Sequence, residues 1–319
     1  MSLIVFIHER LIFHPTSYGA SLDLNTLEVY MIAITGITGN IGSQLARNLL
    51  AAGQTVRAVV RDVRRGQPWA DLSCEVAVAD INDAAALAQA FKGAEAVFLL
   101  VPPNFDPQPG FPEAHIIASS LTSALQAARP ATTVYLSTVG AQAVQSNLLS
   151  QHTIIEEALR KLPLPITFLR PAWFMENAAW DVSSARDNGQ IASFLQPLDR
   201  SIPMVATADI AHVAARLLVE KNSDHKIVEL QGPERVSPKQ LAATFAELLG
   251  NPVTAQAVSR ESWQSLFESQ GMKNPTPRIN MLDGFNQGWI DFESDPSQVL
   301  TGTVPLKTVL QSLVNNSSK

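Results

Sequence analysis

The chain has 319 residues, a formal net charge of −6, and 46% hydrophobic against 16% charged side chains. Such a chain can bury a sizeable core, and its acidic balance argues against direct nucleic-acid binding, because phosphate contact needs a basic face. The single cysteine, Cys74, excludes a disulfide within the chain and a thiolate metal cluster, which suits a reducing cytoplasm. No apolar run approaches the roughly 20 residues of a membrane helix, so we expect no membrane span.

Residues 1–30 precede the first strand signal. The run from Met1 to Phe13 is apolar, but His8, Glu9 and Arg10 interrupt it and no basic leader precedes it, which makes it a poor secretory signal. We expect a weakly ordered N-terminal extension, of the kind that an upstream start codon produces.

Strand and helix signals then alternate from Met31 to about Phe174. Continuous apolar runs such as 96–101 are typical of a parallel sheet that is covered on both faces. Strands are expected at 31–35, 55–60, 75–79, 96–101, 133–137 and 166–170, and helices at 43–50, 83–91, 113–128 and 149–161. These repeated units predict an α/β fold, a Rossmann-type doubly wound parallel sheet, over residues 31–174.

The alternation loosens after Pro171. Helices are expected at 209–218, 238–249 and 261–269, and strands at 226–230 and 253–258. Ser237 is a suitable N-cap for the second of these helices, with Pro238 in its first position. Residues 175–319 therefore predict a smaller α/β cap over a substrate, partly interleaved with the sheet.

Three glycines stand between the first strand and the first helix. Gly36, Gly39 and Gly42 are three apart, and the helix after them has apolar residues on one face. In a dinucleotide-binding turn, the first glycine makes the turn, the second admits the pyrophosphate, and the third lets the helix pack closely. We expect cofactor contacts from Gly36, Thr38, Gly39, Asn40, Ile41 and Gly42.

Arg61 closes the second strand, where dinucleotide folds meet the adenosine ribose. An arginine there pairs with the 2′-phosphate of NADP, whereas a carboxylate accepts from the 2′-hydroxyl of NAD. Arg64 and Arg65 follow closely, so NADP(H) is the preferred cofactor. The neighbouring Asp62 leaves NAD(H) open, and a solvated basic loop is the alternative.

Other candidates follow the later strands, at the carboxyl edge where ligands of such sheets bind. Asp80 and Ile81 are candidates for holding the adenine, or for a helix-entry cap, and Ser137 for reaching a carbonyl substrate or the nicotinamide. The further cofactor candidates are Val101 and Pro102, and the candidates for the substrate pocket are Pro103, Trp173, Phe174 and Asn177, of which the aromatic residues could instead be core.

His152 and Glu156 share one face of the helix at 149–161. In the catalytic hypothesis, His152 donates a proton at the nicotinamide edge and Glu156 orients it. The alternative is a solvated polar pair. No metal site is expected, because no third ligand is indicated.

The chain resembles the NmrA-like family of atypical short-chain dehydrogenases from about Met31 to Leu310. The resemblance rests on the glycine pattern, Val59-Val60-Arg61, Ser137-Thr138-Val139-Gly140, His152-x-x-x-Glu156 and Leu169-Arg170-Pro171-Ala172-Trp173-Phe174-Met175-Glu176-Asn177. That family includes NADPH-dependent quinone and azo-dye reductases, and also NADP-binding redox sensors.

The chain departs from typical short-chain dehydrogenases because it lacks their Tyr-x-x-x-Lys pair. Ketone reduction by the usual route is therefore disfavoured, whereas a quinone accepts hydride with much less acid assistance. The resemblance implies an NAD(P)H-dependent oxidoreductase of a quinone-like small acceptor. The alternative is an NADP(H) sensor that acts through a protein partner without turnover.

Overall fold

The large parallel sheet organises the molecule. The computed structural model describes residues 29–317, so most of the extension expected at residues 1–30 lies outside the described residues. Eight strands are ordered β13–β10–β6–β5–β4–β1–β2–β3, and all their pairings are parallel. They are β1 (Met31–Thr35), β2 (Thr55–Val60), β3 (Glu75–Val78), β4 (Ala96–Leu99), β5 (Thr132–Leu136), β6 (Ile166–Pro171), β10 (Lys226–Gln231) and β13 (Leu300–Thr301). The expected doubly wound Rossmann-type sheet is confirmed.

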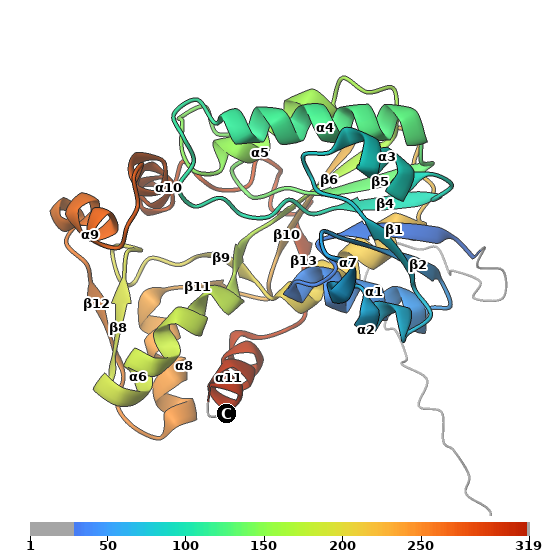
Figure 1. Cartoon of the computed structure of the whole chain (residues 1–319). Coiled ribbons are helices and arrows are strands. Elements are labelled where there is room, and N and C mark those ends of the chain that lie inside the picture. The colour runs from blue at the N-terminus through green and yellow to red at the C-terminus, as the bar shows by residue number, and fades with distance from the viewer. Residues whose placement is uncertain (1–28, 318–319) are drawn as a thin grey trace, which may run out of the picture.

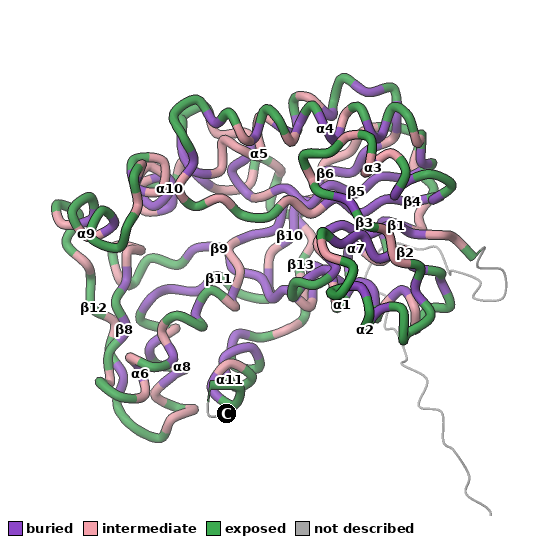
Figure 2. Tube along the Cα trace, in the orientation of Figure 1, coloured by how far each residue is buried: buried purple, intermediate pink, exposed green. Residues whose placement is uncertain are grey.

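Helices cover both faces of this sheet (Figure 1). One face carries α3 (Ala84–Phe91), α4 (Pro112–Ala128) and α5 (Ser150–Leu159), and the other carries α1 (Asn40–Ala51), α2 (Gln67–Ala70) and α7 (Thr207–Val219). Each face has its own apolar core, and the strands between the helices are mostly buried (Figure 2). The carboxyl ends of the strands are thereby held rigidly along one edge.

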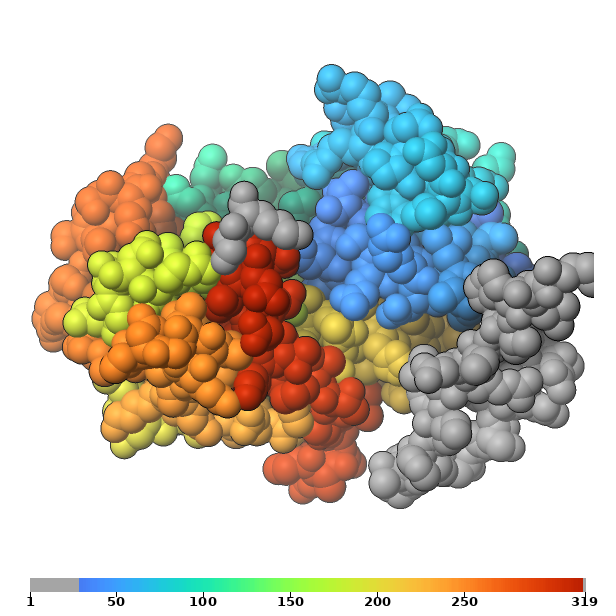
Figure 3. Space-filling model, turned by 90° about the horizontal axis from the view of Figure 1, so that it is seen from below, coloured from blue at the N-terminus to red at the C-terminus, as the bar shows by residue number. Residues whose placement is uncertain are grey.

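A third apolar core lies among shorter elements beside the sheet. Helix α11 (Leu306–Asn316) packs there against η3 (Met175–Asp181) and α8 (Pro238–Leu249). In the view from below, the red C-terminal segment lies beside orange residues of this region (Figure 3). Two small sheets are present, β11–β9–β7 and β12–β8. Their strands are β7 (Trp173–Phe174), β8 (Gln190–Ser193), β9 (Ile202–Val205), β11 (Arg235–Val236) and β12 (Thr254–Ala257), and the helices are η3 (Met175–Asp181), α6 (Val182–Asn188), α8 (Pro238–Leu249), α9 (Trp263–Ser269), α10 (Thr276–Gln287) and α11 (Leu306–Asn316).

Strong local signals predicted α8 best. The helix has its predicted bounds, and Ser237 and Gln240 form a complete capping box in front of Pro238. By contrast, strands β7, β8, β9, β11 and β13 were not predicted, because two to four residues carry too little periodicity. The domain boundary expected between residues 174 and 175 stays a prediction. Three elements that follow it in the chain nevertheless belong to the large sheet or pack on it, namely β10, β13 and α7.

Candidate functional site

The turn between β1 and α1 is shaped by its glycines. Gly36 has a φ of +67°, and a Cβ there would lie 2.8 Å from the Leu100 side chain. A Cβ on Gly42 would collide with the Gly36 carbonyl oxygen, whereas one on Gly39 would make only an ordinary contact of 3.5 Å. Packing therefore requires the first and third glycines. The second one is the N-cap of α1, and the first N–H groups of a helix, which lack partners within it, can bind an anion.

A cavity of about 100 Å³ lies beside this turn, at the carboxyl edge of the sheet. The predicted cofactor residues Gly36, Thr38, Arg61, Ile81 and Pro102 line it together. Its remaining lining comes mainly from the ends of β1, β2 and β4, and consists of Thr35, Val59, Val60, Arg65, Ala79, Leu87 and Leu100. The lining is therefore mostly apolar, with the basic side chains of Arg61 and Arg65 among it.

Asp80 forms hydrogen bonds within its own turn. Its carboxylate accepts from the backbone N–H and the side-chain amide of Asn82, both at 2.9 Å. This local turn leads into α3, whose N-cap is Asp83. These bonds fit the helix-entry alternative for Asp80, whose contact with the adenine stays a prediction. Of the two residues, Ile81 lines the cavity and Asp80 does not.

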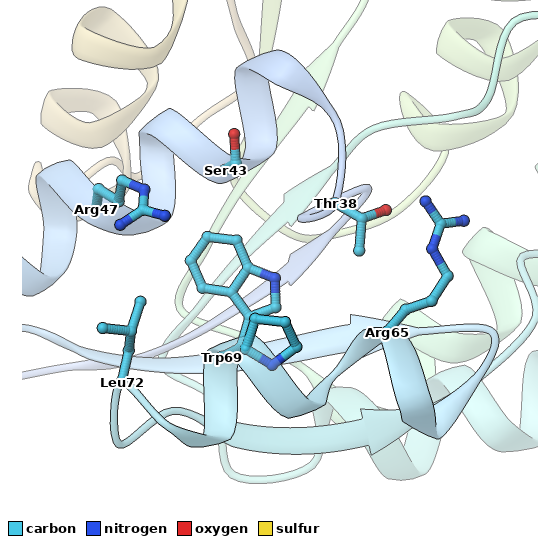
Figure 4. A pocket seen from close by; sticks show the side chains of 7 residues that line it. Thr38, Ser43, Arg47, Arg65, Trp69 and Leu72 are labelled. Carbon is cyan, nitrogen blue, oxygen red and sulfur yellow. The ribbon is translucent and has the colours of Figure 1, made fainter.

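A second cavity, of about 300 Å³, adjoins the first one and shares Thr38 and Arg65 with it (Figure 4). Arg47 and Arg65 stand on opposite sides of it, and the Arg47 guanidinium lies 5.7 Å from the centre of the Trp69 ring. Sequence reasoning missed Arg47 and Trp69. The one available signal was a cation on the exposed side of α1, one turn after Ser43.

The basic residues after β2 have unequal roles. Arg64 forms an ion pair with Asp62 at 2.5 Å, and this hydrogen bond holds the pKa of Asp62 below its ordinary value. The Asp62 carboxylate also caps the short helix η2 (Val63–Arg65). Among residues 29–317, no carboxylate pairs with Arg61 or Arg65, and both residues line the first cavity. Their charges are available to an anionic ligand.

Two hydrogen-bonded pairs join β5 to α5. The Tyr135 Oη lies 2.7 Å from His152 Nδ1, and the Ser137 hydroxyl donates to Glu156 Oε1 at 2.6 Å. The sequence predicted instead that Glu156 would orient His152. The prediction was wrong because it considered only spacing along the helix, whereas both side chains reach across to the strand below.

Glu156 belongs to a buried ion pair with Arg170. Arg170 donates from Nε to Oε1 at 2.9 Å and from Nη2 to Oε2 at 2.6 Å, and both side chains are 3% exposed. Burial by itself would raise the pKa of Glu156, but Arg170, with help from Ser137 and Arg160, leaves it below its ordinary value. Arg170 also binds Glu293 at 2.6 Å, which ties β6 to the segment after α10.

Burial keeps the other pair uncharged. Burial lowers the pKa of His152 to about 4, although the nearby Glu156 charge works in the opposite direction. The pKa of Tyr135 is raised well above 10, first by burial and then by Glu156. At neutral pH the imidazole is therefore neutral and the phenol is protonated.

The predicted substrate-pocket residues are spread over several environments. Trp173 packs edge-on against Phe285 of α10, with ring centres 5.2 Å apart. Phe174 packs against the core beneath the sheet, whereas Pro103 and Asn177 are exposed. The aromatic residues thus have packing partners, which fits the alternative that they are core residues.

No helix among residues 29–317 combines the length and the apolar composition that a membrane crossing needs.

Comparison with known proteins gives consistent matches over most of the chain. Quinone oxidoreductase 2 of Escherichia coli (strain K12) is 30% identical over 290 residues, which are 89% of this chain and 97% of that protein. NAD(P)H azoreductase of Xenophilus azovorans is 25% identical over 281 residues, 87% of this chain and 93% of that protein.

Solved structures agree with this fold. The NADPH-dependent quinone oxidoreductase of Escherichia coli complexed with NADPH gives a TM-score of 0.74 at 25% identity, covering 91% of this chain and all of that one. The triphenylmethane reductase of Citrobacter sp. complexed with NADP(H) shares the fold, with a TM-score of 0.74 at 24% identity over 89% of this chain and all of that one. A model of the NmrA-like family matches residues 29–281, and the chain therefore belongs to the NmrA-like family.

Proposed function

We propose that this protein is an NADPH-dependent reductase of quinone-like small acceptors. The observation that carries the proposal is the glycine turn beside Arg61 and Arg65, with which no carboxylate of residues 29–317 pairs, in a chain related along its length to a quinone oxidoreductase. A second relative, named an NAD(P)H azoreductase, supports the same class of two-electron acceptor.

The residues at the carboxyl edge fit a phosphorylated dinucleotide. The pyrophosphate would lie against the turn at Gly39, where the N-terminus of α1 offers N–H groups. Arg61 and Arg65 would pair with the 2′-phosphate, because Asp62, the group that would favour NAD(H), is bound to Arg64. NADPH is therefore the preferred cofactor, with weaker use of NADH.

The reaction needs little acid catalysis. When bound, the nicotinamide supplies a hydride to the acceptor. Reduction of a quinone leaves a phenolate, which is far less basic than the alkoxide from a ketone, so the absent Tyr-x-x-x-Lys pair is dispensable. The protein then contributes mainly proximity and orientation, and His152, on the first turn of α5, is the candidate group at the acceptor oxygen.

The test is a screen of NADPH oxidation by the purified protein with quinones, azo dyes and enones, run beside NADH. We expect turnover with quinones and a preference for NADPH. Tight NADPH binding without turnover on any acceptor would overturn the enzyme proposal and favour a sensor that acts through a protein partner. A cytoplasmic location is part of the proposal, and its support is the single, buried Cys74, which has no disulfide partner within the chain.

A further inference from the structure

Tyr135 is buried in the middle of the sheet, and its hydroxyl contacts His152. The side chain is 0% exposed, and among residues 29–317 the only hydrogen-bond partner of its oxygen is His152 Nδ1, at 2.7 Å. This contact can be made in two ways. Either the phenol donates to an unprotonated Nδ1, or Nδ1–H donates to the phenol oxygen.

Hydrogen-bond satisfaction decides between the two. If Nδ1–H were the donor, the phenol O–H would be left buried without an acceptor, which costs about 1–3 kcal/mol. If the phenol donates, its hydrogen is satisfied and the imidazole hydrogen moves to Nε2. The phenol is protonated in both arrangements, as its pKa, raised well above 10 by burial, requires, so the choice rests on the buried O–H.

We propose that Tyr135 is a positioning residue that fixes His152 as the neutral Nε2–H tautomer, so that His152 serves as a hydrogen-bond donor to the acceptor oxygen. Nε2 has no hydrogen-bond partner among the described residues, and His152 is only half-buried, so this N–H is free for a ligand. The same helical turn lies against the loop after β4, where Gln151 Nε2 donates to the Asn104 carbonyl at 3.0 Å.

The atoms and charges of the reaction balance with His152 as a neutral hydrogen-bond donor. A hydride adds two electrons and one hydrogen to the quinone and leaves one oxygen as a phenolate. A neutral N–H can hold that developing charge, while the proton that completes the hydroquinone comes from water. The role of His152 in turnover rests on the proposed function. The tautomer is a property of the protein alone.

The decisive measurement is nitrogen NMR of the full-length protein labelled with ¹⁵N-histidine, at neutral pH and without ligands. His152 is assigned by the signal lost in His152→Gln. We expect an unprotonated Nδ1 and a protonated Nε2. A protonated Nδ1 in the wild-type protein would overturn the inference, whether or not any acceptor is reduced.

Tyr135→Phe should remove the constraint, so that a detectable share of the Nδ1–H tautomer appears. The matched control is Tyr30→Phe, which removes a phenol hydroxyl at the residue before β1 and should leave the His152 signals unchanged. With a quinone that the wild-type protein reduces, Tyr135→Phe should lower kcat about five- to tenfold while the Kd for NADPH stays constant. Identical His152 signals in both variants would refute the role of Tyr135.

Discussion

Glu156 and Arg170 form a bidentate ion pair with both side chains almost fully buried. The distances are 2.9 Å from Nε to Oε1 and 2.6 Å from Nη2 to Oε2. The pair joins α5 to β6 directly behind the Ser137 hydroxyl. A buried charge that loses its partner is expensive, so this pair makes the stability of the region depend on both members.

Arg170→Met should destabilise the protein by about 3–5 kcal/mol, because it leaves the Glu156 carboxylate buried without its main counter-charge. Urea unfolding followed by circular dichroism measures the change. The control is Arg260→Met, which breaks a more exposed pair with Asp283 and should cost no more than about 1 kcal/mol. In the double variant Glu156→Leu/Arg170→Met, much of the lost stability should return. Equal losses at Arg170 and Arg260 would contradict this account.

Acid should destabilise the protein partly through His152. Its folded pKa of about 4 lies below the ordinary 6.5, so between those values the unfolded chain binds more protons, and stability falls as the pH falls from 6.5 to 4. The contribution is up to about 3 kcal/mol. His152→Gln should flatten this part of the curve of unfolding free energy against pH, and an unchanged slope would contradict the lowered pKa of His152.

Asp181 should change the pH dependence of stability in the direction opposite to His152. Burial raises its folded pKa from 3.8 to about 6, so the folded state binds more protons, and its contribution to stability is lost as the pH rises from about 4 to 6. Asp181→Asn should therefore make stability rise more steeply with pH in that range. The same pH series of urea unfolding curves tests it, and a change of slope in the same direction as His152→Gln would show the sign to be wrong.

The choice of cofactor should depend on Arg61. Arg61→Glu is expected to weaken NADPH binding by about 10- to 100-fold or more, and NADH binding much less, because only NADPH has the 2′-phosphate. Fluorescence titration gives both constants. Arg64→Glu makes the same change of charge on a side chain that is bound to Asp62, and its effect should be smaller. Equal losses for both cofactors would remove the assignment of NADPH.

The second and third glycines of the turn should respond differently to a methyl group. Gly42→Ala should destabilise the fold by several kcal/mol, roughly the cost of overpacking, because its Cβ would meet the Gly36 carbonyl. Gly39→Ala has room for its Cβ and a φ of −91°, so the fold should persist while NADPH and NADH bind about equally more weakly. Thermal unfolding and fluorescence titration separate the two effects, and normal cofactor binding by Gly39→Ala would place the pyrophosphate elsewhere.

Local chemistry explains which predictions from the sequence were confirmed. Strands β1 and β2 and helix α8 begin and end where the apolar runs, Pro238 and Ser237 predicted, because these signals act within a few residues of the chain. The glycine turn was likewise readable, since Gly36 must adopt a positive φ and Gly42 must pack closely. The family resemblance has the same local origin.

Hydrogen bonds and ion pairs between side chains of different elements could be determined only from the tertiary structure. The sequence predicted that His152 would pair with Glu156. In the structure, His152 contacts Tyr135 and Glu156 accepts from Ser137, both from β5 or its end. Which arginine stays free after β2 depends on the ion pair that Asp62 makes with Arg64. The sequence alone thus determined most of the large sheet, the turn and the class of cofactor, since periodicity and glycine stereochemistry are local. Only the fold decided the proton positions and charge pairings, because these depend on which side chains face each other across the buried interface.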